Sequence, residues 1–177
     1  ITRNILGLIP RKRNLKILDV GCGTGTFNIL PIVKKFKDAD IYGVDISKEM
    51  INVTKKRFPK YKFEVSDANN LPFNNGTFDV VISRQVIEHL RDPNAAIREM
   101  RRVLKTGGKI IISTPSWFGL IGPLYFYKKN LGKMQPIDDW WSPLSIRRLF
   151  RSEKIRITVY KSTNIIPYHK ILPESLV

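Results

Sequence analysis

The chain has very few of the residues that build disulfide frameworks and metal centres. Its 177 residues include one cysteine, Cys22, and two histidines, His89 and His169. A single cysteine excludes any internal disulfide framework and fits a reducing cytoplasm. The two histidines are far apart in the sequence and neither belongs to a recognised ligand spacing, so the sequence predicts no metal site.

Acidic residues are also scarce. The chain carries 15 Asp and Glu against 31 Lys and Arg, which gives a formal net charge of +16 at pH 7. Such an excess raises the local concentration of any polyanion, so RNA, DNA and an anionic membrane surface are all candidate partners. Part of the charge recurs at helical spacing as a basic stripe, which consists of Arg98, Arg101, Arg102 and Lys105. This basic stripe is either a solvated outer face or a phosphate-binding track.

The chain lacks a long uninterrupted hydrophobic run. Residues 110 to 127 contain no charge, but two prolines and two glycines interrupt them, namely Pro115, Gly119, Gly122 and Pro123. These interruptions argue against a membrane-spanning helix. The sequence also contains no internal repeat, low-complexity stretch or signal-peptide pattern.

The hydrophobic residues that are present lie in short runs rich in Ile and Val. Four such runs, at 17–20, 41–44, 78–82 and 110–112, alternate with helical patterns. This order predicts parallel strands that are linked by right-handed crossovers and covered by helices on both faces. A length of 177 residues suits a single domain with a substantial core. The sequence therefore predicts an α/β fold with a doubly wound, mostly parallel sheet.

Three helices are predicted from their capping residues. One begins with Asp92 as N-cap, followed by a proline, and should end at Gly107. A second is capped by Ser47 and a third by Ser142. The residues expected to face the core from these helices are Met50, Val53 and Thr54, then Ile97, Met100, Val103 and Leu104, and finally Leu144, Leu149 and Phe150.

Two features predict irregular structure. Pro31 lies where the first crossover helix should run, so that helix is either kinked or begins late. Ile155, Ile157 and Val159 alternate with polar neighbours, as in an edge strand. Only this one strand pattern follows the last helix, and the chain begins at Ile1. We therefore expect a sheet that is truncated at its last edge strand.

The most informative stretch is the glycine run that follows the first strand. Asp19 stands at the end of that strand, and glycines follow at alternate positions, Gly21, Gly23 and Gly25. Glycines let the backbone turn tightly against a bound molecule, because no Cβ is in the way. A dinucleotide fingerprint needs its third glycine at the sixth position of the motif, which is Thr26 here. The spacing therefore predicts a nucleoside cofactor without a pyrophosphate.

Five ordered segments carry the remaining signal. They are ILDVGCGTGTF (17–27), IYGVDIS (41–47), VSDANNLPF (65–73), FDVVISRQVIEHL (78–90) and LKTGGKIIISTPS (104–116). Together they resemble the class I S-adenosylmethionine-dependent methyltransferases, in particular their small-molecule branch, over roughly residues 15 to 116. The resemblance implies a Rossmann-like fold, S-adenosyl-L-methionine as cofactor and S-adenosyl-L-homocysteine as product.

The resemblance also implies which residues contact the cofactor. Asp45, 20 positions after Gly25, would accept hydrogen bonds from the ribose hydroxyls, and Asp67 would lie by the adenine amino group. Taken alone, each is equally a turn or cap residue. Asp19 would bind the cofactor's ammonium, directly or through water, or cap the glycine turn. The full set of expected cofactor residues is Asp19, Gly21, Cys22, Gly23, Gly25, Asp45, Ile46, Asp67, Ala68, Ser83 and Arg84.

Two residues near the expected cofactor site have competing interpretations. Cys22 is a nucleophile or a small packing residue, and packing is favoured because no histidine or basic neighbour is evident to activate it. His89 follows the fourth strand, where related enzymes place residues close to the transferring methyl group. It is a general base for a hydroxyl or acidic carbon, or a capping or packing histidine. No catalytic triad is expected, since alignment alone can supply about 7–11 kcal/mol.

The segment 117–141 is rich in aromatic residues and long for a connection, so we treat it as an aromatic lid or insertion. Three interpretations of this segment compete. It forms a hydrophobic cap over the cofactor, a pocket for an apolar acceptor such as a quinone or lipid, or a contact with an anionic membrane surface. Aromatic rings beside lysines also stack on unpaired bases, which keeps RNA among the partners. The single domain, 1–177, thus divides into a cofactor-binding core (15–116), this insertion, and a last helix and edge strand (142–177).

The sequence as a whole predicts a cytoplasmic methyltransferase that moves a methyl group to a small-molecule or lipid-like acceptor. A tRNA or rRNA methyltransferase is the first alternative. Against it, the chain has Ser83 to Val86 where nucleic-acid base methylases place an Asn/Asp-Pro-Pro-Tyr/Phe motif. A non-catalytic, cofactor-binding partner subunit is the second alternative. The sequence specifies neither the acceptor nor the oligomeric state.

Overall fold

The computed structural model describes residues 2–114, 142–153 and 155–158, so predictions for the aromatic insertion and for Val159 lie outside these residues. Five parallel strands form one sheet in the order β3-β2-β1-β4-β5. The strands are β1 (Lys16–Val20), β2 (Asp40–Asp45), β3 (Lys62–Val65), β4 (Phe78–Arg84) and β5 (Leu104–Ser113). The predicted parallel, doubly wound α/β fold is confirmed.

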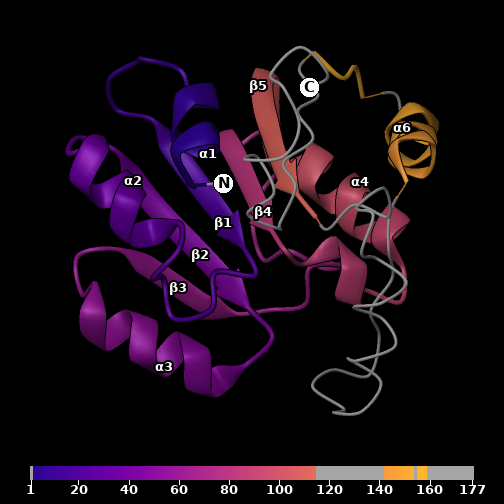
Figure 1. The fold of residues 1–177 in the computed structure, drawn as a ribbon. Coiled ribbons are helices and arrows are strands. Elements are labelled where there is room, and N and C mark those ends of the chain that lie inside the picture. Colours follow the sequence, from indigo (N-terminus) through magenta and orange to yellow (C-terminus); the bar gives the residue numbers. More distant parts are fainter. Residues whose placement is uncertain (1, 115–141, 154, 159–177) are drawn as a thin grey trace, which may run out of the picture.

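Helices cover both faces of the sheet (Figure 1). One face is covered by α1 (Thr2–Leu8), α2 (Ile29–Lys35) and α3 (Lys48–Arg57). The other face is covered by α4 (Pro93–Val103) and α6 (Pro143–Ser152), and a short 3-10 helix, η1 (Ile87–His89), follows β4. Within the described part of the chain, no helix is long and apolar enough to cross a membrane.

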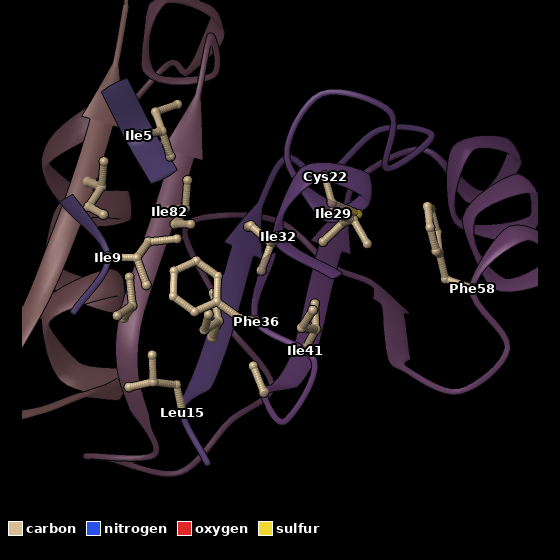
Figure 2. Packing of buried hydrophobic residues seen from close by; sticks show 14 of the residues in the cluster. Ile5, Ile9, Leu15, Cys22, Ile29, Ile32, Phe36, Ile41, Phe58 and Ile82 are labelled. Carbon is tan, nitrogen blue, oxygen red and sulfur yellow. The ribbon is translucent and has the colours of Figure 1, made fainter. Parts of the chain in front are cut away.

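The central strand β1 is buried on both faces. Ile17 packs in the cluster under α1, α2 and α3, whereas Leu18 and Val20 pack in the cluster under α4. Since side chains alternate along a strand, Asp19 points to the same face as Ile17. Figure 2 shows the first cluster, in which Ile29 and Ile32 of α2 lie over the sheet. Burial of each such side chain contributes about 1.5–3 kcal/mol.

The predicted helix starts are confirmed by their caps. The side chains of Ser47, Asp92 and Ser142 each accept a hydrogen bond from the backbone N–H three residues later, at 3.2, 2.9 and 3.0 Å. The helix that contains Pro31 begins late, at Ile29, after the glycine run has turned the chain. A proline in the first turn of a helix is tolerated because the N–H that it lacks would have no partner there.

The inward faces of two helices were partly mispredicted. On α3 the buried residues are Ile51 and Thr54, while Met50 and Val53 are exposed, so the helix is rotated by one residue from the expected face. On α6 the prediction for Leu149 is confirmed, since this residue is buried. The other two predicted core residues of α6 are less buried than Leu149. Phe150 is partly buried against the core, and Leu144, near the N-cap, is exposed.

The predicted end of α4 is wrong. The helix ends at Val103 rather than Gly107, and the apolar Leu104 begins β5, where it pairs with Phe78 of β4. The next pair is Val80 with Lys109, so residues 105–108 bulge out of the strand. An apolar residue at position 104 continues the helical pattern, which is why the helix was predicted to extend further. Its pairing with the neighbouring strand decides the outcome instead.

The shortest strand and the expected edge strand were also mispredicted. β3 was not among the four apolar runs, because Phe63 is its one buried residue. Residues 155–158 form no strand. The Ile155 N–H instead donates to the Phe150 carbonyl at 2.9 Å, which folds this segment back on α6.

Candidate functional site

The glycine loop, residues 21–25, lies at the carboxyl end of β1 and is fastened to β2. The N–H groups of Gly21 and Cys22 donate to the Val44 carbonyl oxygen at 2.8 and 2.9 Å. Gly21 has a φ of +73°, and a Cβ at this position would collide with the Val86 side chain. Both the backbone conformation and the available space therefore require glycine here.

Asp45, at the end of β2, holds the glycine loop through both carboxylate oxygens. Oδ2 accepts from the Gly23 N–H at 2.8 Å, and Oδ1 accepts from the Ser47 N–H at 3.0 Å. Each oxygen has a second lone-pair position, so Asp45 keeps acceptor capacity for the hydroxyl groups of a ligand. The following residue, Ile46, is exposed beside it.

Helix α3 holds the other side of the glycine loop. The Thr54 hydroxyl donates to the Gly23 carbonyl oxygen at 2.6 Å. Arg57 donates to the Thr26 hydroxyl, also at 2.6 Å. Sequence reasoning assigned neither Thr54 nor Arg57 to the site, because their contacts depend on how α3 packs against the loop.

Two pockets open along this edge of the sheet. The first, which we call the strand pocket, has a volume of about 300 Å³. Six of the residues predicted from the sequence line it. Its lining residues are Val20, Gly21, Val44, Asp45, Ile46, Ser66, Asp67, Ala68, Gln85, Val86, His89 and Leu90.

The second pocket, which we call the loop pocket, has a volume of about 450 Å³. Gly21 and Gln85 line both pockets, so the two meet at the start of the glycine loop. A ligand that occupies both pockets has to cross this junction. The lining residues of the loop pocket are Gly21, Cys22, Gly23, Thr24, Thr26, Phe27, Asn28, Met50, Arg84 and Gln85.

Asp67 and Ala68 follow β3 and bring polar and apolar groups to the strand pocket. The Asp67 side chain is exposed, and its Oδ1 accepts from the Asn69 N–H at 2.8 Å. This Asx-type bond fixes the carboxylate but leaves its other oxygen open to a ligand. Ala68 is buried, so it offers a small apolar surface.

Asp19 is buried at the end of β1 and lines neither pocket. Its Oδ1 accepts from Asn28 Nδ2 at 2.8 Å. Burial raises the pKa of Asp19 to about 7, although the Asn28 hydrogen bond and the Arg84 charge oppose the rise. Sequence reasoning missed Asn28, since no motif position marks it.

Two further predicted cofactor residues, Ser83 and Gly25, are buried and line neither pocket. Among the described residues, Ser83 Oγ has no hydrogen-bond partner. Gly25 has a φ of +71°, and a Cβ there would lie 2.7 Å from the Phe58 ring. Gly25 is therefore required for the packing of the loop on α3, and contact of either residue with a cofactor stays a prediction.

Cys22 is packed in the core while also lining the loop pocket. A Cβ at Gly43 would lie 2.9 Å from Cys22 Sγ and 2.7 Å from the Phe63 ring, which shows how closely these groups fit. Burial raises the pKa of the Cys22 thiol well above its ordinary value. The thiolate needed for a nucleophile is thus disfavoured, and packing accounts for this residue.

Arg84, at the end of β4, brings a guanidinium to the loop pocket. It donates to the Thr2 hydroxyl at 2.9 Å and to the Phe27 carbonyl oxygen at 3.3 Å. The guanidinium also lies 4.9 Å from the centroid of the Phe27 ring. Burial lowers the pKa of Arg84 and the Asp19 carboxylate opposes that effect, and arginine remains a cation in proteins.

Gln85, which sequence reasoning missed, has the left-handed backbone conformation that side chains rarely adopt, with a φ of +56°. Its N–H donates to the Ser113 carbonyl oxygen at 2.7 Å, which holds it against β5. The only signal in the sequence was its place directly after β4. His89, on η1, lines the strand pocket, and its role near the transferring methyl group stays a prediction.

A metal centre is not formed by the residues that the structure describes. Within 2–114 and the described part of 142–158, no group of three His, Cys, Asp or Glu side chains is arranged to hold a metal ion. The groups that line the two pockets are carboxylates, a guanidinium, backbone groups and apolar surface.

Comparison with known proteins agrees with this architecture. The family model described as "Methyltransferase domain" matches residues 11–139. An uncharacterized protein of Methanocaldococcus jannaschii is 34% identical over 158 residues, which cover 86% of this chain and 71% of that protein. Ajmaline N-methyltransferase of Rauvolfia serpentina is 39% identical over 109 residues, which cover 58% of this chain and 37% of that enzyme.

A solved structure gives the same result for the fold. The crystal structure of a Thermotoga maritima methyltransferase, described as a possible histamine N-methyltransferase, has a TM-score of 0.70 and 26% sequence identity. The match covers 85% of this chain and 67% of that one. The chain spans only 31–39% of the length of three of its curated relatives, which include ajmaline N-methyltransferase.

Proposed function

The chain belongs to the S-adenosylmethionine-dependent methyltransferases, and we propose that its two pockets bind one cofactor molecule, with adenosine in the strand pocket and the amino-acid part in the loop pocket. The proposed reaction moves the methyl group to a small-molecule or lipid-like acceptor. The observation that carries the proposal is the junction of the two pockets at Gly21 and Gln85. A cofactor bound across that junction has its sulfur, and so its methyl group, at the point that both pockets share.

The side chains around the pockets fit the parts of this cofactor. Asp45 has open lone pairs for the ribose hydroxyls, and Asp67 has an open oxygen for the adenine amino group. Ile46 and Ala68 supply apolar surface for the faces of the adenine ring. In the loop pocket, Arg84 presents a guanidinium that matches a carboxylate.

Alignment is the main contribution that this chain makes to the reaction. The cofactor supplies a methyl group that the sulfonium already activates, so transfer needs an acceptor held in line with the carbon–sulfur bond. The glycine loop is pinned by Asp45 on one side and by Thr54 on the other, which fixes the walls of the junction. His89, which lines the strand pocket, takes the proton of an acceptor hydroxyl or acidic carbon.

The rim of the crevice supports an apolar acceptor. Phe27 and Met50 at the loop pocket and Ile46 at the strand pocket are large apolar residues that are 67%, 42% and 74% exposed. Apolar side chains that line a ligand pocket suit an apolar ligand. The similarity to ajmaline N-methyltransferase also supports a small-molecule acceptor.

An RNA acceptor is the second candidate, because the net charge of +16 favours a polyanion. The basic stripe adds little to it, since three of its four side chains are engaged in ion pairs. The prediction that all four lie on one helix is also wrong, because Lys105 lies in β5. These pairs are Arg98 with Asp92 and Glu153, Arg102 with Glu99, and Lys105 with Asp79. These ion pairs neutralise part of the charge of the stripe, which weakens the phosphate-track interpretation, while Arg98 and Arg101 are exposed to solvent.

One residue supports the cellular compartment that we propose. Cys22 is a free, buried cysteine. Proteins of oxidising compartments commonly use their cysteines in disulfides, whereas free thiols are typical of the cytoplasm. This supports our proposal of a cytoplasmic protein.

Cofactor binding is tested by isothermal titration calorimetry with S-adenosylmethionine. Asp45→Ala removes the acceptor of the ribose hydroxyls and one anchor of the glycine loop, so it should weaken binding by about 1–3 kcal/mol. Asp38→Ala, on an exposed turn, is the matched control and should leave the affinity unchanged. Absence of binding by the unmodified protein would reject the proposed function.

The acceptor is tested with methyl-labelled S-adenosylmethionine and a panel of quinols, aromatic amines, lipids and tRNA. Label in an organic extract supports the proposed acceptor class, and label in tRNA supports the second candidate. Tight cofactor binding without label on any acceptor supports the partner-subunit interpretation. His89→Ala should lower turnover but not cofactor affinity, and an unchanged rate would return this residue to a structural role.

A further inference from the structure

The exposed charged residues of the layer formed by α4 and α6 are all arginines. This layer covers one face of the sheet, and Arg98 of α4 donates to the Glu153 carboxylate, just after α6, at 3.2 Å (Figure 1). Every exposed charged side chain in Pro93–Val103, Pro143–Ser152 and 155–158 belongs to an arginine. These six residues, which we call the arginine face, are Arg98, Arg101, Arg147, Arg148, Arg151 and Arg156.

The acidic residues of the same layer offset little of this charge at the surface. The side chains of Glu99 and Glu153 are only 19% and 12% exposed, and each is bound to an arginine of α4. Within the part of the chain that the structure describes, Arg101, Arg148 and Arg151 form no ion pair. Like charges that are held together repel one another, so the arginine face favours an anionic partner.

The opposite face of the sheet carries its positive charge differently. The exposed cations of α2 and α3 are lysines with the exception of Arg57, and the exposed Glu49 lies among them on α3. Arginine presents a planar fork that binds a phosphate group through two parallel hydrogen bonds, whereas lysine is a point charge. The arginine face is therefore suited to phosphate groups in particular.

Leu144 favours a lipid surface over a nucleic acid as the source of these phosphates. Its side chain is 74% exposed and lies on the stripe of α6 that also carries Arg148 and Arg151, at positions i, i+4 and i+7. The boundary between lipid headgroups and acyl chains offers an apolar contact to such a side chain. The exposed residues of α4 and α6 that the structure describes include no aromatic ring on which unpaired bases could stack.

We propose that the arginine face docks the protein on a membrane surface that contains anionic phospholipids, with Arg148 and Arg151 on lipid phosphates and Leu144 at the headgroup boundary. Basic residues and an apolar side chain supply two kinds of attraction to such a surface. No residue of the arginine face lines either pocket, so docking does not occupy the cofactor site. The inference goes beyond the proposed function and does not depend on the identity of the acceptor.

The test measures binding of the full chain to sedimented vesicles. One set of vesicles is phosphatidylcholine alone, and the other is an equal mixture of phosphatidylcholine and phosphatidylglycerol. Arg148→Gln/Arg151→Gln is compared with Lys55→Gln/Lys56→Gln, which removes the same charge from exposed positions of α3 on the opposite face. We expect the unmodified protein to prefer the mixed vesicles. The arginine variant should bind them at least about tenfold more weakly, and the lysine variant should stay within about threefold of the unmodified protein.

Leu144→Ser separates membrane docking from nucleic-acid binding, because it changes no charge. It should weaken binding to the mixed vesicles by about threefold or more and leave any binding of tRNA unchanged. Circular dichroism and thermal unfolding of all three variants should match the unmodified protein, which shows that they fold.

Four outcomes would overturn the inference. They are no preference of the unmodified protein for mixed vesicles, equal losses in the two charge variants, an unchanged vesicle affinity of Leu144→Ser, and loss of tRNA binding in the arginine variant with vesicle binding retained. The last outcome would assign the arginine face to a nucleic acid. Cofactor binding is measured separately, so none of these outcomes bears on the proposed function.

Discussion

The Glu99 carboxylate and the Arg102 guanidinium, three residues apart on α4, form a two-bond ion pair with both N···O distances at 2.7 Å. Both side chains also bind the backbone of Leu71: Glu99 accepts from its N–H at 2.8 Å, and Arg102 donates to its carbonyl oxygen at 2.9 Å. This clamp holds the loop between β3 and β4 against α4. The same loop carries Asp67 of the strand pocket, so a residue of the basic stripe supports the cofactor site from outside it.

Arg102→Ala should lower both stability and cofactor affinity. The change leaves Glu99 and the Leu71 carbonyl without their charged donor, which should reduce the free energy of unfolding by about 1–3 kcal/mol. Release of the loop should also weaken S-adenosylmethionine binding. Urea unfolding and calorimetry measure the two effects. Arg98→Ala, which removes the more exposed ion pairs of Arg98 with Asp92 and Glu153, is the control and should cost less than about 1 kcal/mol. Equal effects of the two changes would contradict the clamp.

Asp79 forms a second cluster at the opposite, amino end of the sheet. Its carboxylate accepts from the Lys16 N–H at 2.9 Å, from Lys105 Nζ at 2.9 Å and from Lys12 Nζ at 3.3 Å. Burial alone would raise the pKa of Asp79, but the Lys16 hydrogen bond and the two lysines outweigh it and lower the pKa to about 2. The folded state therefore binds a proton less readily than the unfolded chain does.

Asp79→Asn should destabilise the protein at neutral pH and much less in acid. A folded pKa about two units below the unfolded value corresponds to about 2 kcal/mol, fully present above pH 4. It is lost as the pH falls through the folded pKa near 2. Urea unfolding of both proteins at pH 7, 4 and 2 should show the difference shrink over the last interval. A difference that is independent of pH would show that packing, and not charge, is the cause.

The parts of the fold that the sequence predicted are those that local requirements determine. The left-handed backbone at position 21 requires a glycine there. The unpaired N–H groups at helix starts require capping side chains, which Ser47 and Asp92 provide. The contacts of Asn28 and Arg102 could not be predicted in this way. Each depends on which side chain another element brings alongside, and neither residue type is unusual at its position.

The predicted ends and inward faces of helices were wrong where two local preferences compete. Leu104 continues the apolar face of α4, but its pairing with Phe78 places it in β5. On α3 the exposed Met50 and the buried Ile51 are similar in hydrophobicity, so a single residue decides which face meets the sheet. Such choices are made by tertiary packing, which the pattern along the chain does not contain.

Gln85→Gly should be more stable than Gln85→Ala. Both changes remove the side chain, but alanine keeps the cost of about 1–2 kcal/mol for a side chain in the left-handed region, whereas glycine does not. After the greater entropy loss of glycine, about 0.5–1 kcal/mol, a difference of about 1 kcal/mol in favour of glycine is expected. At Asn14, whose φ is +52°, the glycine variant is likewise expected to be more stable than the alanine variant. Thermal unfolding checks both positions, and the reverse order would argue against strain.

The two Gln85 variants should also separate stability from binding. Because Gln85 lines both pockets, its loss should weaken S-adenosylmethionine binding whichever residue replaces it. The Asn14 variants should bind the cofactor normally, since Asn14 lines neither pocket. Calorimetry of all four variants makes this comparison. Full affinity in Gln85→Gly would show that the backbone, and not the side chain, is what the junction needs.

Gly21→Ala should destabilise the protein and reduce cofactor binding, and Val86→Ala in the same chain should restore part of the stability. The added Cβ collides with the Val86 side chain, so trimming that side chain removes the collision. The φ of +73° remains unfavourable for alanine, and rescue is therefore incomplete. Urea unfolding of the two single variants and the double variant gives the interaction energy, which should exceed about 1 kcal/mol. Additive effects, within about 0.5 kcal/mol, would mean that backbone conformation alone requires glycine at this position.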